Sequence, residues 1–454
     1  MPGSLCAQPA TELAALLRRK EVSAREVLRA HLDRVAEVDP QIGAIVALDV
    51  EGAMRRAGAL DDMAARRRLA GPLHGVPVAI KDVFDAEGLA TTHGSRAAPH
   101  GAAGRDAVHV ARLRAAGAVI FSKTNTAEFA YGAQTTNPVF GTTRNPHDLT
   151  RSVSGSSGGA AAALAAGMAA LADGSDLGGS IRAPAGLAGV VGLRPTSRAV
   201  PLVGAARPFD GLNVPGPMAR TVQDVALMLE AMAGAHPGDP CSRDLATARG
   251  LQVRGLRVAW CLTPGGAPIA PAIRAVLEPV RTLLEEMGAQ VEEADPGLGF
   301  MLGAQQTFRD WSALLELGET WRRDPNLLGP EVRRTLLRSQ ALTASDLARA
   351  EADRKRGWEA MRAFYAMHDL CLWPINSQPP YGADEDPSEI DLDETATLAT
   401  PLLGIPALAM PIAVAPAGFP VGLQLIGPSG SDRDLLAVAR QIERAVAFPG
   451  RDSK

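Results

Sequence analysis

Hydrophobic residues recur along this chain at two spacings, one typical of helices and one of strands. Residues 1–68 have the helical spacing: Ser23-Ala-Arg-Glu26 is spaced as a capping box, and apolar residues follow it at intervals of three and four. Short apolar runs at 76–80 and 119–121 predict strands, and residues 108–116 predict a helix between them. This alternation predicts an α/β fold.

The rest of the chain continues the alternation with longer helices. An Ala-rich helix is predicted over 159–171, between a polar loop at 132–159 and a second small-residue stretch at 174–196. Residues 302–369 are strongly helical, with Leu347, Trp358, Met361 and Phe364 expected in the core. Further helices are predicted at 222–232, 272–287 and 431–446, and further strands at 256–261, 407–414 and 421–426.

Composition narrows the class of protein without changing this fold prediction. Of the 454 residues, 46% are hydrophobic and 21% charged, an ordinary globular balance. A net charge of -4 gives no electrostatic reason to expect a nucleic-acid partner. The four scattered cysteines form no CxxC pair and suit a reducing compartment, and no apolar run is long enough to span a membrane. We therefore expect a cytoplasmic enzyme; the oligomeric state is not derivable, and a homodimer stays open.

Two glycine-rich segments contain serines in settings that suit catalysis. The loop at 151–159 runs directly into the predicted helix, whose first N–H groups can face an anion. In the second segment Ser180 follows Gly178-Gly179, so that consecutive backbone N–H groups can point to one spot beside its hydroxyl, as an oxyanion hole requires. Each segment alone is equally well explained as a structural turn.

Lys81 ends the predicted strand at 76–80 and is the third candidate. A lysine there is most often an exposed strand terminus. If it is buried near the serines, desolvation disfavours its charged form and lowers its pKa. The neutral amine could then act as a general base.

Other chemistries have weaker support in the sequence. Gly155-x-Ser157-x-Gly159 matches the nucleophile-elbow pattern, but the polar residues 145–150 before it are not the buried strand that an elbow requires. The histidines, His368 among them, lie in no suggestive context. Zinc-protease, P-loop and dinucleotide motifs are absent from the sequence. We expect no metal and no cofactor.

Taken together, these segments closely resemble the amidase signature family over nearly the whole chain. The matching segments are Gly71-Pro-Leu-His-Gly-Val-Pro-Val-Ala-Ile-Lys-Asp82, Lys123-Thr-Asn125, the Ser/Gly loop at 151–159, Gly174-Ser-Asp-Leu-Gly-Gly-Ser-Ile-Arg-Ala-Pro184, Gly189–Thr196, Gly216–Val222, Gly404–Leu408 and Pro420–Gly427. The resemblance implies a single domain, 1–454, with a mixed β-sheet covered by helices on both faces. Its signature core would span about 69–225, a variable helical region about 226–380, and completing C-terminal strands and helix about 381–446.

The resemblance also implies roles for individual residues. The family's catalytic lysine falls on Lys81, its middle serine, which follows a cis peptide bond, on Ser156, and its nucleophile on Ser180. Supporting roles fall on Ser157, Asp176 and Arg182. The oxyanion-hole N–H groups would belong to Leu177, Gly178, Gly179 and Ser180.

The implied activity is amidohydrolase action on linear amides through a seryl acyl-enzyme. A small neutral or aryl amide is the expected substrate, with esters and carbamates left open. Candidate substrate-binding residues are Phe129, Ala130, Tyr131, Trp311 and Trp373. Three alternatives remain: the glutaminase subunit of a tRNA-dependent amidotransferase, an α/β-hydrolase-type esterase that uses Ser157 and a histidine, and a non-catalytic binding protein.

Overall fold

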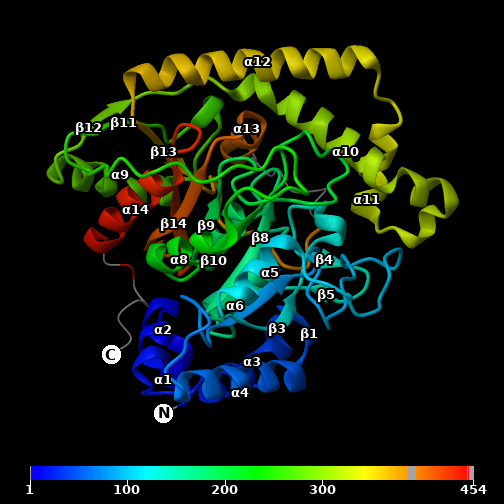
Figure 1. Ribbon diagram of the computed structural model, residues 1–454. Helices are drawn as coiled ribbons and strands as arrows, with labels where there is room; N and C mark the ends of the chain where they lie inside the picture. The colour runs from blue at the N-terminus through cyan, green and yellow to red at the C-terminus, as the bar shows by residue number, and fades with distance from the viewer. Residues whose placement is uncertain (1, 387–394, 447, 449–454) are drawn as a thin grey trace.

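A computed structural model describes residues 2–386, 395–446 and 448. They form one domain built on an 11-stranded mixed β-sheet with helices around it (Figure 1). The predicted α/β class, with a sheet between helical layers, is confirmed. Across the sheet the strands follow the order β1 (Ile45–Leu48), β3 (Val119–Thr124), β2 (Pro77–Lys81), β8 (Leu171–Asp176), β10 (Val214–Ala219), β9 (Val191–Arg194), β14 (Ala407–Val414), β15 (Pro420–Ile426), β13 (Leu370–Pro374), β11 (Arg257–Trp260) and β12 (Gln290–Glu293).

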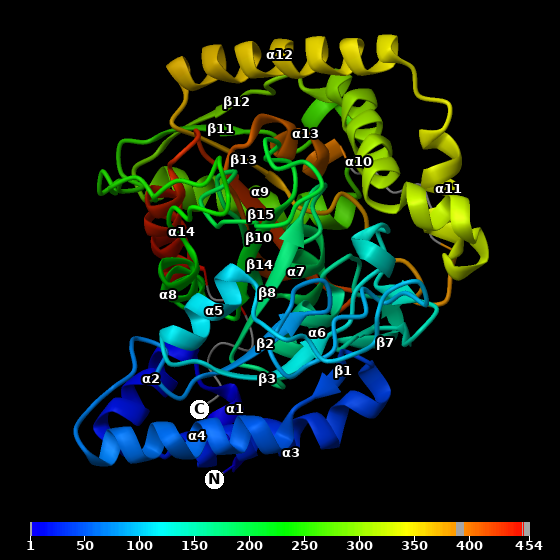
Figure 2. The same cartoon turned by 45° about the vertical axis from the view of Figure 1, so that its right-hand side comes forward.

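Helices surround the sheet. They are α1 (Pro2–Ala7), α2 (Ala10–Arg19), α3 (Ala24–Ile42), α4 (Val50–Ala65), α5 (Val108–Ala115), α6 (Gly158–Ala165), α7 (Arg182–Ala188), α8 (Val222–Met232), α9 (Pro271–Glu286), α10 (Leu302–Arg323), α11 (Pro330–Ser339), α12 (Ala344–Met367), α13 (Thr395–Leu403) and α14 (Asp432–Ala445). Helices α6 and α7 pack together on one face of the sheet, and α8 and α14 pack together on the other (Figure 2). Helices α10 and α12 lie above the sheet in both views, with α11 beside them.

Two neighbouring strands, β2 and β8, place the candidate site near their C-terminal ends. Strand β2 pairs in parallel with β8, and Ala79 lies beside Ala172. Because these two parallel strands run in the same direction, Lys81 at the end of β2 lies level with the second half of β8. The loop that precedes α6 contains two short hairpins, β4 (Thr136–Asn137) with β5 (Gly141–Thr142) and β6 (Arg144–Asn145) with β7 (Asp148–Ser152).

Strand β8 is the main departure from the predicted elements. We predicted a helix over 159–171, whereas α6 ends at Ala165 and residues 171–176 form a strand paired on both sides. Its sequence, Leu-Ala-Asp-Gly-Ser-Asp, contains no β-branched or aromatic residue, so local propensity gives no strand signal. Pairing with β2 and β10 determines this conformation.

Two further predictions also need correction. Strand β1 interrupts the region 1–68 that we predicted to be helical, because Ile45 and Leu48 pair with β3. Trp358, predicted in the core, is 45% exposed, whereas Met361 and Phe364 are buried as expected. Helix α12 packs only one of its sides against the protein, and Trp358 lies outside that side.

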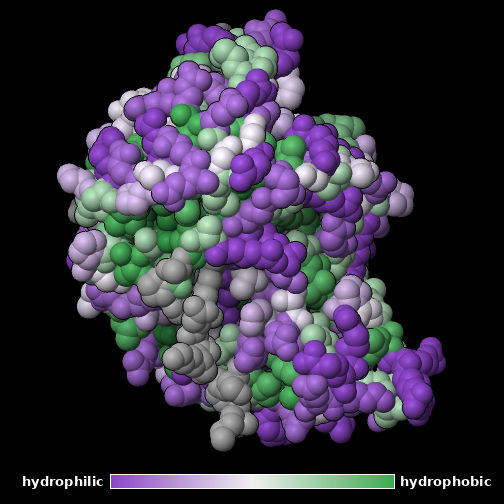
Figure 3. Space-filling model, turned by 90° about the vertical axis from the view of Figure 1, so that its left-hand side faces the viewer, coloured by the Kyte–Doolittle hydropathy of each residue, from purple (hydrophilic) through white to green (hydrophobic). Residues whose placement is uncertain are grey.

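Crossing a membrane requires a helix that is both long and apolar. Within the described residues, no helix has both the length and the apolar character needed to cross a bilayer. On the face shown in Figure 3, hydrophilic residues are interspersed with smaller groups of hydrophobic ones. Single apolar side chains at the surface, such as the 81% exposed Phe209, are normal for a globular protein.

Gly159 allows α6 to approach Asn125, the residue that follows β3. A Cβ atom at Gly159 would lie 2.4 Å from the Asn125 backbone nitrogen and 2.5 Å from its carbonyl oxygen. Neither backbone atom can move aside as a side chain could. The small residues at the start of α6 are therefore a packing requirement as well as a feature of the loop.

Gly159→Ala should destabilise the protein by about 1–3 kcal/mol, the usual cost of overpacking a tight interior. Gly303→Ala is the matched control, because a Cβ at Gly303 in α10 meets nothing within 4 Å. It should change stability by no more than about 1 kcal/mol, the helix-propensity difference between the two residues. Urea unfolding midpoints of both variants check this expectation, and equal midpoints would contradict it.

Candidate active site

Three segments distant in sequence meet at the end of β2. The first supplies Lys81, the second is the loop that carries Ser156 and Ser157, and the third is β8 with the turn that follows it. The peptide bond between Gly155 and Ser156 is cis, as the resemblance implied. The backbone N–H of Ser157 donates to the carbonyl oxygen of Ser180 at 3.0 Å, which joins the second segment to the third.

The amine of Lys81 is surrounded by hydroxyl groups. Its Nζ lies 2.7 Å from Ser156 Oγ, 2.8 Å from Ser157 Oγ and 2.9 Å from Ser175 Oγ. Lys81, Ser156 and Ser157 have no exposed surface, and Ser175 is 2% exposed. The expected burial of Lys81 beside the serines is therefore observed, and Ser175 is a third partner that we did not predict.

Three hydroxyl partners can satisfy a neutral lysine as well as a charged one. A neutral amine donates two hydrogen bonds and accepts one, so one of its three hydroxyl partners must donate to it. The Ser157 hydroxyl donates to the carbonyl oxygen of Ser175 at 3.4 Å, so Ser157 can only accept from Lys81. Ser156 or Ser175 is then left to donate to the amine. Both hydroxyls line the pocket together with Ser180, and Ser156 is the one to which the resemblance assigns the proton relay.

Burial lowers the pKa of Lys81 to about 7, because the charged amine would lose its hydration. The carboxylates of Asp173 and Asp176 raise it again in part. Asp173 is held in place by two contacts: it accepts from the Lys81 backbone N–H at 2.6 Å, and its other oxygen lies 2.8 Å from His109 Nε2. A substantial fraction of Lys81 is thus uncharged near neutral pH.

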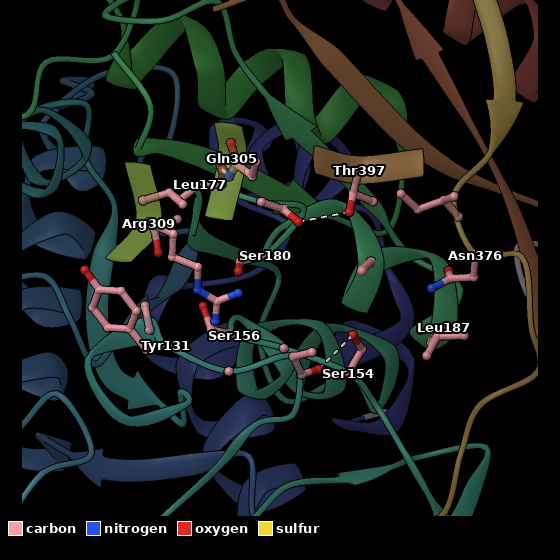
Figure 4. A pocket seen from close by; sticks show the side chains of 18 of the residues that line it. Tyr131, Ser154, Ser156, Leu177, Ser180, Leu187, Gln305, Arg309, Asn376 and Thr397 are labelled. Atoms are coloured by element: carbon pink, nitrogen blue, oxygen red, sulfur yellow. Dashed lines mark hydrogen bonds between the residues drawn. The ribbon is translucent and has the colours of Figure 1, made fainter. Parts of the chain in front are cut away.

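Ser180 lies in the turn between β8 and α7, beside a pocket that Ser156 also lines. Figure 4 shows the hydroxyl groups of Ser156 and Ser180 in the same part of this pocket. Among the described residues the Ser180 hydroxyl makes no hydrogen bond. Catalytic hydrogen bonds are often long in unliganded structures and shorten when substrate binds. Ser180 is therefore free to meet a substrate.

Two side chains hold the turn before Ser180 by its carbonyl groups. Gln305 Nε2 donates to the Leu177 carbonyl oxygen at 2.7 Å, and Thr397 Oγ1 donates to the Gly178 carbonyl oxygen at 2.9 Å (Figure 4). In a trans peptide the next N–H points away from the carbonyl, so these two contacts orient the N–H groups of Gly178 and Gly179. The predicted oxyanion donors Leu177, Gly178 and Ser180 donate to no other group within the part of the chain that the structure describes.

Gly179, the fourth predicted donor, differs from the other three. Its N–H donates to Asp176 Oδ1 at 2.9 Å and is thus already used. Its φ of +106° and the Thr397 Cβ, 2.5 Å from where a Cβ would lie, make glycine a requirement here. The role of Gly179 is to shape the turn.

Asp176 anchors this turn through buried charges. Its carboxylate pairs with Arg182 at 2.9 Å and with Arg194 at 3.5 Å, and none of the three side chains is exposed. Burial opposes ionisation, but the two guanidinium groups and the Gly179 N–H hold the pKa of Asp176 at about 2. Asp176 and Arg182, predicted as supporting residues, thus hold the turn in place and are not among the residues that line the pocket.

The predicted substrate-binding residues are only partly brought together. Phe129, Ala130 and Tyr131 line the pocket. Trp311 instead stacks under Arg207, whose guanidinium carbon lies 4.0 Å from the ring centroid, and Trp373 is core in β13 at 2% exposure. Neither tryptophan lines the pocket among the described residues.

Several pocket residues were missed from the sequence. They come from α10, from the segment after β13 and from α13, which carry no motif and so gave no signal: Gln305, Arg309, Asn376 and Thr397. The side-chain oxygens of Gln305 and Asn376 are buried and have no hydrogen-bond partner within the described residues.

Metal ligands do not cluster in the described residues: no group of three or more His, Cys, Asp or Glu side chains could hold an ion there. The four cysteines are free. His368, the histidine considered for a Ser157-based site, contacts the carbonyl oxygen of Phe364 and the carboxylate of Glu292. No histidine is among the residues that line the pocket within the described chain.

The fold and the site together define an α/β protein with a buried lysine–serine cluster beside a pocket. The sequence matches the profile of the Amidase family over residues 26–436. It is 37% identical to the A subunit of the glutamyl-tRNA(Gln) amidotransferase of Acidothermus cellulolyticus, over 97% of this chain and 95% of that one. It is 35% identical to an acylamidase of Rhodococcus erythropolis, over 96% and 94% respectively.

Solved structures give the same result. A bacterial aryl acylamidase of the amidase signature family superimposes with a TM-score of 0.89 at 26% identity, covering 96% of each chain. The 6-aminohexanoate cyclic dimer hydrolase does so with a TM-score of 0.88 at 29% identity, covering 97% of this chain and 98% of that one. This chain belongs to the amidase family.

The pKa of Lys81 predicts how activity depends on pH. If the neutral amine is the working form, kcat/KM should fall tenfold per pH unit on the acid side, with a midpoint near pH 7. Asp173→Asn removes a negative charge that raises the pKa of Lys81, so the midpoint should move to lower pH. The measurement is kcat/KM across pH 5–9.

Glu51→Gln is the control for that experiment. Glu51 is exposed on α4, and its substitution removes the same charge far from the hydroxyl cluster. Its midpoint should equal that of the unchanged protein. An equal shift in both variants, or an acid limb that persists in Lys81→Ala, would show that another group controls the profile.

Proposed function

We propose that this chain hydrolyses the carbon–nitrogen bond of a small-molecule amide, with Ser180 as nucleophile and Ser156 and Lys81 as the proton relay. The observation that carries the proposal is the contact between the buried Lys81 amine and Ser156, which lines the same pocket as Ser180. A serine hydroxyl becomes a useful nucleophile only beside a base that removes its proton. A lysine with a pKa of about 7 is such a base near neutral pH.

The reaction then proceeds in two halves. Ser180 Oγ attacks the carbonyl carbon while its proton passes to Ser156, whose own proton passes to the neutral Lys81 amine. Collapse of the tetrahedral intermediate breaks the carbon–nitrogen bond, and the relay returns the proton to the leaving amine. Water next attacks the acyl-enzyme through the same relay, which releases the carboxylic acid and restores Ser180.

Backbone N–H groups of Leu177, Gly178 and Ser180 supply the charge stabilisation. The negative oxygen that develops during each attack needs donors already in place, because donors in a water-poor site act strongly and need no reorganisation. The hydrogen bonds that Gln305 and Thr397 make to the Leu177 and Gly178 carbonyl oxygens hold this turn in place. Each such donor is worth about 2.7–4 kcal/mol of transition-state stabilisation.

The pocket favours an amide with an aryl or alkyl group. Its apolar lining comes from Phe129, Tyr131, Leu177, Leu187 and Ile375. The similarity to acylamidases supports this substrate class. Esters and carbamates present the same carbonyl to the same nucleophile and fall within the proposal.

Glutamine hydrolysis within an amidotransferase is the second candidate, supported by the similarity to the A subunit of glutamyl-tRNA(Gln) amidotransferases. A protein of that kind would need partner chains and would deliver ammonia to them. The chemistry at Ser180 would be the same, so the two candidates differ in substrate and in partners.

Ser180→Ala should reduce amide turnover by at least a thousandfold and leave the fold intact, because the nucleophile is lost while its surroundings stay. The assay is release of 4-nitroaniline from an acyl 4-nitroanilide, with circular dichroism as the folding check. Hydroxylamine should divert the acyl group of the active enzyme to a hydroxamate. Turnover that survives Ser180→Ala, or hydrolysis with no trapped acyl group, would exclude the seryl acyl-enzyme.

The isolated chain should hydrolyse anilides faster than glutamine. The two rates are measured on the purified protein alone, as 4-nitroaniline release and as ammonia release. Glutamine hydrolysis that appears only when the other chains of an amidotransferase are added, together with no anilide activity, would favour the second candidate.

A further inference from the structure

Arg309 places a positive charge in the wall of the pocket. It lies on α10, one helical turn after Gln305, so the two side chains share a face of that helix. Both line the pocket together with Ser156 and Ser180. In Figure 4 the guanidinium group of Arg309 points from the α10 side into the pocket region where those two serines lie.

No carboxylate within the described residues pairs with Arg309, although the protein has acids nearby in sequence. Asp310, the next residue, is bound by Arg338 at 3.0 Å and by Gln306 at 2.7 Å. The contact that the structure gives Arg309 is with the ring of Tyr131, whose centroid lies 5.9 Å from the guanidinium carbon. The five N–H donors of the guanidinium are thus available to a ligand.

Glu316 is the other charged residue that lines the pocket among the described residues. It lies seven positions further along α10, a rise of about 10 Å. Its carboxylate accepts a hydrogen bond from the Tyr131 hydroxyl at 3.1 Å and forms no ion pair with Arg309. Tyr131 therefore separates the two charges, binding the acid through its hydroxyl and the guanidinium through its ring.

We infer that Arg309 binds a carboxylate of the substrate, so that the amide hydrolysed at Ser180 carries a negative charge elsewhere in the molecule; this rests on the function proposed above. A guanidinium binds a planar carboxylate through two parallel N–H donors, which gives orientation as well as affinity. One guanidinium matches the single charge of a carboxylate. A phosphate would bring a second charge with Glu316 nearby, and among the described residues no second cation lines the pocket.

The inference narrows the neutral substrate predicted from the sequence to an acidic one. The apolar lining still accepts the aryl or alkyl body of the molecule, while Arg309 selects for its charge. The carboxylate can belong to the acyl part or to the amine part, and two matched pairs of probes distinguish these sources. The acyl pair is glutaric acid mono-4-nitroanilide with pentanoic acid 4-nitroanilide, and the amine pair is 4-acetamidobenzoate with 4-methylacetanilide.

In one of the two pairs, the kcat/KM of the acidic probe should exceed that of its neutral partner by tenfold or more. Arg309→Met should bring this ratio close to one, and Arg309→Lys should keep part of it because it retains charge without the planar fork. A merely structural role for Arg309 would lower both members of the pair equally and leave the ratio unchanged. Arg323→Met, at an exposed position of the same helix, should leave the ratio as it is.

Calorimetric binding to Ser180→Ala keeps this inference separate from the proposed function. The acidic probe of the preferred pair should bind this variant at least tenfold more tightly than its neutral partner, and adding Arg309→Met should remove the difference. Arg309-dependent binding of the acidic probe without hydrolysis of any probe by the unchanged protein would refute the amidase proposal and keep the carboxylate site. Ratios near one in both pairs, or a preference that survives Arg309→Met, would overturn the carboxylate site and leave the amidase proposal standing.

Discussion

The site depends on keeping water away from one amine. Lys81 is buried completely, and its nearest polar neighbours are three hydroxyl groups. Hydroxyls can satisfy its hydrogen bonds in either protonation state, but they cannot repay the loss of hydration that a charged ammonium suffers. Hence the low pKa comes from the surroundings as a whole, and any change that admits water to this point would return the amine to its ordinary, charged form.

The sheet provides those dry surroundings. Strand β2 lies between β3 and β8, and every residue of these three strands is buried. Such central strands have no exposed edge through which water could reach the end of β2. The turn that carries Ser180 and the loop that carries Ser156 cover that end, and the hydrogen bond from Ser157 to the Ser180 carbonyl joins them. The architecture of the whole domain thus determines the chemistry of one side chain.

The sequence allowed us to predict the lysine, the serines and the α/β class, because they belong to segments with strong local signals. Strand β8 could not be recognised, since its small residues favour no element by themselves and its pairing is a tertiary effect. Ser175 was missed for the same reason. Arg309 and Gln305 lie in a long helix without a motif, where the face turned to the pocket depends on how α10 packs. We predicted that Trp373 binds substrate because it is a large aromatic residue, but such side chains are more often buried in the core, as Trp373 is.

A second buried lysine shows what makes Lys81 unusual. Lys123 lies on the neighbouring strand β3, where its register partner in β2 is Ile80, and it too has no exposed surface. Burial lowers the pKa of Lys123 as well, but its ammonium lies 3.3 Å from the Asp82 carboxylate and 2.8 Å from the Phe84 carbonyl oxygen. An adjacent negative charge and fixed carbonyl dipoles favour the ammonium form, so Lys123 serves as a structural cation. Asp173, the carboxylate that most raises the pKa of Lys81, is instead engaged by His109 and by the Lys81 backbone N–H. Two lysines in equally dry positions can therefore hold different charges, because the placement of one carboxylate decides which of them keeps its proton.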